Sequence, residues 1–349
     1  MEPLLSVSDL GVSFRTEEGD LHAVRGVSFD VRPGEVVAVV GESGSGKSVM
    51  AMTLLGLTRS KNAFFSGTAY FAGTELITAS ERELRRIRAS QISMIFQNPM
   101  TALNPVQRVG KQIVEQIRAH GDVSRNDARR RAVELMELVG IGRADARADS
   151  FPHEFSGGMR QRVMIAMALS CSPQILIADE PTTALDVTIQ AQILAELDTL
   201  RRETGVAIIL ITHDLGVVAG VADRVLVMYG GKVCEQGSTD EIFLDPQHPY
   251  TWALLGAAPR LDLPRPSRLA TISGVPPSML YPPLGCQFAE RCPHSATPCR
   301  VAPALVANVD SAPDHYDRCW MPLVHKRRLR LVDGRFGLCA KKEDGWAQG

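Results

Sequence analysis

Short apolar runs alternate with helix-forming stretches along the first two thirds of the chain. Residues 35–40 (EVVAVV), 175–178 (ILIA) and 206–211 (VAIILI) are continuous apolar runs of the length expected for buried parallel strands. Residues 47–57 (KSVMAMTLLGL) and 187–203 are rich in helix-forming residues. Because strands and helices alternate, the pattern predicts an α/β fold with a mainly parallel sheet.

The pattern changes twice within this chain. Residues 109–139 carry two amphipathic helical patterns, which predict a helical insertion at about 98–160 within a unit spanning 1–245. The segment 246–322 is rich first in proline and then in cysteine, so regular structure should be sparse there. The basic stretch 323–349 is expected to be a loosely held, flexible tail.

Composition and charge narrow the class of protein. The 349 residues are 45% hydrophobic, and 38 Lys and Arg nearly balance 39 Asp and Glu, which gives no support for a nucleic-acid binder. No apolar run is long enough to span a membrane, and no secretory signal is visible at the N-terminus. We therefore expect a cytosolic protein whose seven cysteines are thiols or metal ligands rather than disulfides.

A glycine-rich turn follows the first apolar run and matches the phosphate-binding pattern G-x-x-x-x-G-K-[ST]. Glycines let successive backbone N–H groups point at phosphate oxygens, and the N-terminus of the following helix adds a positive dipole end. The lysine supplies charge to the β- and γ-phosphates, and the serine a hydroxyl to Mg²⁺. The pattern predicts a nucleotide-binding site made of Gly41, Glu42, Ser43, Gly44, Ser45, Gly46, Lys47 and Ser48.

Two acidic residues end the apolar run at 175–178. Asp179 suits the coordination shell of Mg²⁺, and Glu180 can accept a proton from an attacking water. A lone Asp-Glu pair at the end of a strand is more often a solvated turn. Beside a phosphate-binding loop, the pair indicates a nucleoside triphosphatase.

Further motifs follow in a fixed order along the chain. The run Phe155-Ser156-Gly157-Gly158-Met159-Arg160-Gln161-Arg162 closely resembles the signature of ATP-binding cassette (ABC) transporter ATPases. Gln97, the segment Ala184-Leu185-Asp186 and His213 stand where that family has its Q-loop, D-loop and switch histidine. The resemblance implies a P-loop NTPase cassette in which an antiparallel β subdomain accompanies the mainly parallel sheet.

The resemblance also implies a mechanism. Two ATPase subunits would close head to tail, with ATP between the P-loop of one and the signature of the other. Glu180 would be the general base, while His213 and Gln97 would sense the γ-phosphate. The resemblance assigns Mg²⁺ to Ser48, Gln97 and Asp179, and donors across the interface to Ser156, Gly157 and Gly158 of the signature, which Met159 follows; Asp186 lies in the D-loop.

Two residues qualify the resemblance. Met159 stands where the commonest signature has glutamine, and this variant resembles the oligopeptide and dipeptide importer branch of the family. The donors that would face phosphate precede Met159, so we expect activity to survive. Phe14 is assigned to adenine stacking, and the alternative is a core phenylalanine on a first strand.

Four cysteines form a C-x5-C-x6-C-x19-C series in the last quarter of the chain. Four thiolates can hold one metal or cluster, but the C-x2-C pairs of common zinc modules are absent. The segment, with His248-Pro249-Tyr250-Thr251 upstream, resembles the C-terminal region of peptide importer ATPases, some of which hold a [4Fe–4S] cluster. The resemblance implies a structural cluster, while zinc, joined by His294 or His315, and free thiols stay open; the four are Cys286, Cys292, Cys299 and Cys319.

These features lead to one hypothesis of function. The chain is expected to be the ATP-hydrolysing subunit of an ABC importer of di- and oligopeptides, peripheral on the cytoplasmic face of the inner membrane. Its expected partners are two membrane permeases, a second cassette ATPase and an extracytoplasmic binding protein. A homologous partner is favoured as the second cassette, and a second copy of this chain stays open. The same machinery could import nickel complexes, opines, glutathione or oligosaccharides. A soluble ABC ATPase of ribosomes or DNA repair is a remote alternative, because the chain has one cassette and a neutral charge.

Overall fold

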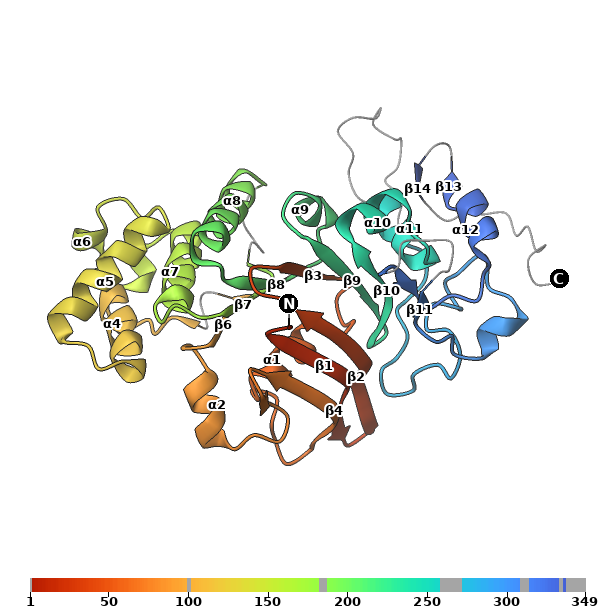
Figure 1. Ribbon diagram of the computed structural model, residues 1–349, viewed down its shortest axis with the longest axis horizontal. Coiled ribbons are helices and arrows are strands. Elements are labelled where there is room, and N and C mark those ends of the chain that lie inside the picture. The colour runs from red at the N-terminus through yellow and green to blue at the C-terminus, as the bar shows by residue number, and fades with distance from the viewer. Residues whose placement is uncertain are drawn as a thin grey trace.

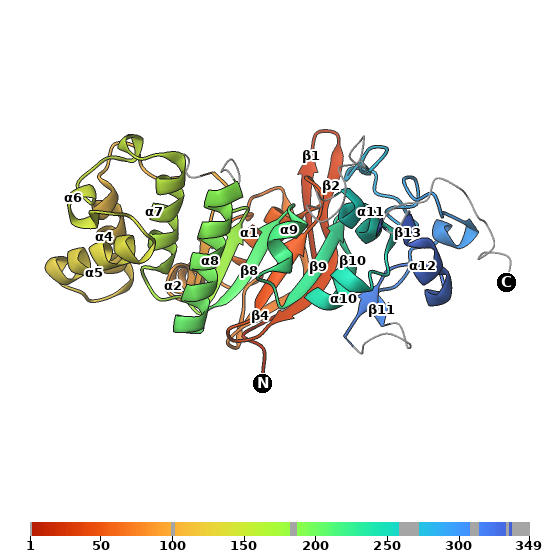
Figure 2. The ribbon, with the colours of Figure 1, turned by 90° about the horizontal axis from the view of Figure 1, so that it is seen from above.

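The computed structural model describes residues 2–98, 102–181, 187–257, 272–307, 314–332 and 335–336. Within these ranges the chain forms a central α/β body, a helical lobe and a C-terminal segment. The lobe and the C-terminal segment lie at opposite ends of the molecule (Figures 1 and 2). This arrangement confirms the predicted α/β cassette with its helical insertion and C-terminal extension.

The larger sheet of the central body has the strand order β11-β12-β10-β9-β3-β8-β7-β6. Neighbouring strands from β9 to β6 run parallel, while β10, β12 and β11 extend the sheet in antiparallel fashion. Strands β3, β6, β7 and β8 are buried along their whole length, as expected for parallel strands covered on both faces. The strands are β3 (Val36–Val40), β6 (Ile92–Ile95), β7 (Ile175–Asp179), β8 (Ala207–Thr212), β9 (Arg224–Tyr229), β10 (Lys232–Ser238), β11 (Val306–Ala307) and β12 (Tyr316–Asp317).

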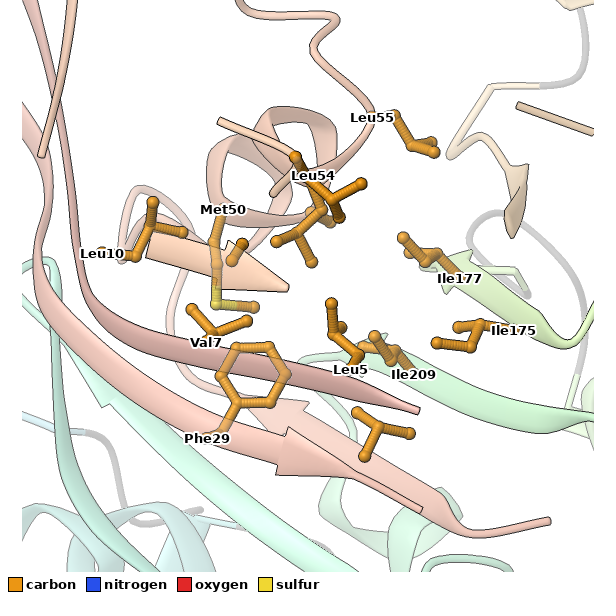
Figure 3. Packing of buried hydrophobic residues seen from close by; sticks show 14 of the residues in the cluster. Leu5, Val7, Leu10, Phe29, Met50, Leu54, Leu55, Ile175, Ile177 and Ile209 are labelled. Atoms are coloured by element: carbon orange, nitrogen blue, oxygen red, sulfur yellow. The ribbon is translucent and has the colours of Figure 1, made fainter. Parts of the chain in front are cut away.

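A second, antiparallel sheet has the order β2-β1-β4-β5 and confirms the predicted antiparallel subdomain. Its strands are β1 (Leu5–Thr16), β2 (Gly19–Val31), β4 (Ala63–Phe71) and β5 (Thr74–Glu75). Helix α1 (Lys47–Leu54) shares one hydrophobic core with both sheets. Side chains from β1, β2, α1, β7 and β8 meet in this core, among them Leu5, Phe29, Met50, Ile177 and Ile209 (Figure 3).

A second hydrophobic core holds the helical lobe against the other face of the parallel sheet. Ile113, Leu135 and Val163 of the lobe are buried in it together with Ile193 of α8 and Leu210 of β8. The lobe consists of α4 (Val109–His120), α5 (Arg125–Leu138), α6 (Ala144–Arg147), a 3-10 turn (Pro152–Glu154) and α7 (Gly157–Leu169); α2 (Glu81–Ile87) precedes β6, and α8 (Val187–Thr204) follows β7.

The C-terminal part has short elements joined by long loops. They are α9 (Leu215–Ala219), α10 (Thr239–Leu244), α11 (Pro249–Ala257), a 3-10 turn (Thr297–Arg300), α12 (Leu323–Leu329), β13 (Leu331–Val332) and β14 (Arg335–Phe336). The expected basic tail thus begins with a helix. In that helix Lys326 is buried, and its Nζ lies 2.7 Å from a carboxylate oxygen of Asp317. Among the described residues, no helix has the length and apolar character needed to cross a membrane.

Candidate nucleotide-binding and hydrolysis site

The glycine-rich loop connects the buried strand β3 to helix α1. Gly41, Gly44 and Gly46 all have positive φ angles, of 153°, 77° and 98°. A Cβ atom on Gly41 would overlap the carbonyl oxygen of Met228, and one on Gly46 the carbonyl oxygen of Ala23. Glycine is therefore required at both positions by the backbone angle and by the close approach of neighbouring strands.

Lys47, the first residue of α1, points back into the loop. Its side chain is buried, and Nζ donates to the carbonyl oxygens of Gly41 at 2.8 Å and Glu42 at 2.9 Å. Burial lowers the pKa of Lys47, and the nearby carboxylates of Glu180, Asp179 and Glu42 oppose this shift. The loop thus holds a desolvated ammonium group where the sequence places the phosphates.

Ser48 and Asp179, which the sequence predicts as ligands of Mg²⁺, lie side by side. The Ser48 hydroxyl donates to Asp179 Oδ1 at 2.9 Å. Burial raises the pKa of Asp179, and Ser48 and Lys47 oppose the shift. A hydroxyl and a buried carboxylate side by side fit a hard divalent cation, whose charge would favour the ionised carboxylate.

Glu180 lies directly after β7 and is contacted on both carboxylate oxygens. Gln97 Nε2 donates to one oxygen at 2.8 Å, and His213 Nδ1 lies 3.3 Å from the other. Glu180 has a φ of 47°, which is uncommon for a residue other than glycine, and its N–H donates to the Ile211 carbonyl at 2.9 Å. The strained turn and the two side-chain contacts hold the carboxylate in one orientation.

Parallel strands bring these residues together. Ile95 pairs with Ala178 across β6 and β7, and Asp179 pairs with Ile211 across β7 and β8. Residues that follow the carboxyl ends of these strands therefore lie at one edge of the sheet, where ligands bind in open α/β folds. The structure groups Gln97, Asp179, Glu180 and His213 there.

The signature motif lies on the helical lobe rather than beside the P-loop (Figure 1). Ser156 caps α7, and its Oγ accepts from the Met159 N–H at 3.3 Å. Ser156 and Gly157 are exposed at the start of a 13-residue helix, whose N-terminus favours anions. Met159 is half-buried and contacts Arg147 through its sulfur at 3.0 Å.

Phe14 is half-buried and packs against the core that surrounds α1. Phe14 pairs with Leu21 across the β1–β2 hairpin. Ala23 follows Leu21 by two residues, and its carbonyl oxygen lies against Gly46 of the P-loop. This places Phe14 near the loop but also on the core, which agrees with both predicted roles. The predicted D-loop residue Asp186 lies outside the described residues.

Cys286, Cys292 and Cys319 lie in loops of the C-terminal segment, and Cys299 lies in the 3-10 turn Thr297–Arg300. The Cys286 N–H donates to the Cys299 carbonyl at 2.9 Å. Burial raises the pKa of Cys286 to about 11 and that of Cys292 to about 12, and it also raises the pKa of Cys319. In the part of the chain that the structure describes, no three His, Cys, Asp or Glu side chains are placed to share a metal ion. His315 instead lies 2.8 Å from Glu235, and His294 packs edge-on against Trp252.

Two contacts to the P-loop come from residues to which the sequence assigns no role there. The Tyr250 hydroxyl accepts from the Glu42 N–H at 2.8 Å, and the Arg291 guanidinium contacts the Glu42 carboxylate. Tyr250 belongs to the His-Pro-Tyr-Thr motif and Arg291 directly precedes Cys292, but both are more than 200 residues from the P-loop. Only the folded chain brings them together.

Comparisons with known proteins agree with this geometry. Residues 24–183 match the ABC transporter family, and residues 234–299 match the oligopeptide/dipeptide transporter C-terminal region. The chain is 53% identical to the dipeptide transport ATP-binding protein DppD of Bacillus subtilis, over 92% of this chain and 95% of that protein. It is 51% identical to the oligopeptide transport ATP-binding protein OppD of Salmonella typhimurium, over 92% and 94%.

Solved structures are similar over the cassette. A dimeric ATP-binding cassette in a post-hydrolysis state, bound to ADP and Pi, superimposes with a TM-score of 0.61 at 28% identity. The match covers 67% of this chain and 98% of that structure. A protein of an ABC transporter complex from Clostridium perfringens matches with a TM-score of 0.60 at 29% identity, over 70% and 92% of the two chains.

Proposed function

The chain belongs to the family of oligopeptide and dipeptide transport ATP-binding proteins of ABC transporters, and we propose that it energises peptide uptake by hydrolysing ATP. The observation that carries this proposal is the Glu180 carboxylate, which Gln97 and His213 contact on its two oxygens. The carboxylate lies beside the Ser48–Asp179 pair at the sheet edge. Nucleotide, cation and attacking water can meet at this edge.

In this proposal Glu180 is the general base. Its fixed carboxylate takes a proton from the water that attacks the γ-phosphorus. The bond between the γ-phosphorus and the oxygen of ADP breaks, and ADP leaves. The His213 side chain is 63% exposed, so it can turn from Glu180 toward the γ-phosphate. Ser48 and Asp179, with Gln97, would hold Mg²⁺, which when bound neutralises charge on the phosphate oxygens.

A complete hydrolysis site is proposed to need two cassettes. Ser156, Gly157 and Gly158 offer a hydroxyl and N–H donors at a helix N-terminus, but on a lobe separate from the P-loop. Head-to-tail closure would bring the signature of one subunit to the γ-phosphate held by the other, with Met159 behind the donors. We infer that the second cassette is a homologous ATPase, as the peptide-importer resemblance implies, rather than a second copy.

A groove beside Gln97 is the proposed docking site for a permease. It encloses about 350 Å³ and is lined by Leu57, Met94, Phe96, Met164 and Met167, with Gln116 at its side. Leu57 and Phe96 are 44% and 39% exposed, so the groove presents apolar surface on which a partner could dock. A cytoplasmic helix of the permease with an apolar face fits such a groove. Movement of that helix would reach Glu180 through Gln97.

The substrate is proposed to be a di- or oligopeptide, delivered by an extracytoplasmic binding protein to two permeases. This chain would then work on the cytoplasmic face of the inner membrane. The support is the match of 234–299 to the oligopeptide/dipeptide transporter C-terminal region and the similarity to dipeptide and oligopeptide transport ATP-binding proteins. Nickel complexes, opines, glutathione and oligosaccharides are the alternatives that the experiment below also separates.

The proposal is tested by capturing the complex. A tagged Glu180→Gln chain is purified in mild detergent with ATP and Mg²⁺ from the native host, and the partners are identified by mass spectrometry. We expect two polytopic permeases and a second cassette ATPase, and any binding protein is then screened against peptides, metal complexes and sugars. The matched control adds Lys47→Ala, which should prevent the ATP-dependent capture. Ribosomal or DNA-repair partners without a membrane protein would contradict the importer.

We also propose that the four cysteines hold a [4Fe–4S] cluster as a structural crosslink. The proposal is supported by four buried or half-buried thiols in one segment with little regular structure. Because no metal-binding group is preformed among the described side chains, cluster binding would require these side chains to turn toward one another. Anaerobically purified protein should then contain about four irons and four sulfides per chain. One zinc per chain and no sulfide would show the zinc alternative instead.

A further inference from the structure

The loop between Cys286 and Cys292 touches the P-loop. The Arg291 side chain is 5% exposed and faces the carboxylate of Glu42, the second residue of the phosphate-binding motif. Nη1 donates to one carboxylate oxygen at 2.6 Å and Nη2 to the other at 3.0 Å. A bidentate pair of this kind fixes both side chains in one relative orientation.

Arg291 is itself held in place from several sides. Its Nε donates to the Ser273 carbonyl at 2.9 Å, and its remaining contacts go to the Ile272 carbonyl and the Tyr229 hydroxyl, both at 3.1 Å. The guanidinium also lies over the rings of Tyr229 and Phe288, 5.6 Å and 5.9 Å from their centres. Such a buried, fully contacted arginine acts as a rigid support for Glu42 rather than as a mobile surface charge.

The backbone of Glu42 is held by the same aromatic cluster. Its N–H donates to the hydroxyl of Tyr250, which is fully buried and lies 4.5 Å from Tyr229, centre to centre. Phe288, in the loop with Arg291, packs 5.4 Å from Tyr250. Glu42 therefore has both its main chain and its side chain fixed by residues that follow β9.

We propose that Arg291 is a positioning residue for nucleotide binding, through which the cysteine segment (residues 272–332) supports the P-loop. The inference rests on the proposed role of residues 41–48 in phosphate binding. Arg291 does not touch the phosphates in this scheme. It neutralises Glu42, whose carboxylate would otherwise face the negative charge of ATP, and it fixes Glu42, whose carbonyl oxygen accepts from Lys47 Nζ.

The decisive variant is Arg291→Met, which keeps the apolar stem and removes the charge. We expect ATP affinity, measured by calorimetry, to fall about tenfold, or about 1.4 kcal/mol, with a much smaller change in kcat. The double variant Arg291→Met/Glu42→Gln should recover most of the affinity, because the unneutralised carboxylate is gone. If Arg291 served only to stabilise the fold, the added Glu42→Gln substitution would not restore the ATP affinity.

A matched control is available in the same segment. Arg327 lies 2.9 Å from Asp245, away from the P-loop, so Arg327→Met removes an arginine–carboxylate contact without touching Glu42. Its ATP affinity should stay unchanged. If Arg291→Met fails to fold, Arg291→Lys keeps the charge without the two-pronged contact and should weaken binding by a smaller factor.

The outcomes separate this inference from the assignment of the phosphate site. Unchanged ATP affinity in Arg291→Met or in its lysine substitute overturns the role of Arg291. A loss that Glu42→Gln does not rescue, and that Arg327→Met reproduces, also overturns it. Unchanged affinity in Lys47→Ala would instead remove the phosphate assignment, whatever Arg291 does.

Discussion

The nucleotide site and the cysteine segment are both built from loops, but different scaffolds position them. Gln97, Asp179, Glu180 and His213 follow buried parallel strands whose register sets their spacing. The cysteine segment has short 3-10 and strand elements, and a few buried polar pairs hold it to the sheet edge. The first region shows grouped functional side chains already in contact, whereas the described cysteines form no preformed metal site.

A sequence motif predicts the geometry of a site when hydrogen-bonded strands hold the residues around that motif in a fixed register. A one-residue change in strand register would move Glu180 away from Gln97, so the hydrogen bonds of the sheet specify the site. In the cysteine segment, the positions of the residues depend instead on side-chain contacts such as that between Glu235 and His315. Substitutions in each region show whether the stability of the cysteine segment and the ATP affinity of the nucleotide site depend on each other.

The largest effect is expected at Glu180, the proposed general base. Glu180→Gln keeps the shape of the side chain but removes the proton acceptor, so steady-state ATP hydrolysis should fall about 10²- to 10⁴-fold. ATP should still bind and stabilise a closed dimer, detectable by size-exclusion chromatography. Hydrolysis at the original rate would show that another group takes the proton.

The buried ion pair of the cysteine segment should give the next largest effect. Lys326 donates to both oxygens of Asp317 at 2.8 and 2.7 Å, and both side chains are 1% exposed. Lys326→Met leaves a buried carboxylate without its cation, so the free energy of unfolding should fall by about 3–5 kcal/mol in urea titrations.

The matched double variant is Lys326→Met/Asp317→Asn, which leaves neither charge buried and should recover part of the stability. ATP affinity of the folded single variant should stay within about twofold of the original, because the pair does not reach the P-loop. A large loss of affinity would show that the two regions form one cooperative unit.

A smaller effect is expected from Lys47→Ala. Removal of this ammonium takes away one charge-assisted contact to phosphate, which is typically worth about 1.5–3 kcal/mol. ATP affinity should therefore fall roughly 10- to 100-fold in calorimetry, while the melting temperature without nucleotide changes little. A large drop in that melting temperature would mean that the Lys47 contacts to Gly41 and Glu42 serve mainly the fold.

The sequence was sufficient to predict the fold class, and it singled out the residues that the structure groups at the edge of the sheet. Local signals carried these predictions, namely apolar strands, the glycine pattern and acids at a strand end. The support of Glu42 by Tyr250 and Arg291 could not be predicted, because no local pattern encodes a contact between residues so far apart in the chain. The helix over 323–329 was also not predicted, because nothing in the sequence distinguishes the buried Lys326 from the other basic residues of that stretch.

The smallest effect is the pH dependence of stability, which tests the contact between Glu235 and His315. Burial would lower the pKa of His315, but the hydrogen bond and charge of Glu235, with Glu241 and Asp317 nearby, raise it above its ordinary value. A raised pKa in the folded state means that the stabilisation is complete below the ordinary histidine pKa and is lost as the pH rises through the folded value. The melting temperature of the protein should therefore fall as the pH rises above the ordinary histidine pKa. His315→Gln should flatten this dependence, measured by calorimetric scans, while the pH dependence of ATP binding stays the same. An equal pH slope in both proteins would show that the Glu235–His315 pair does not secure the segment to the sheet.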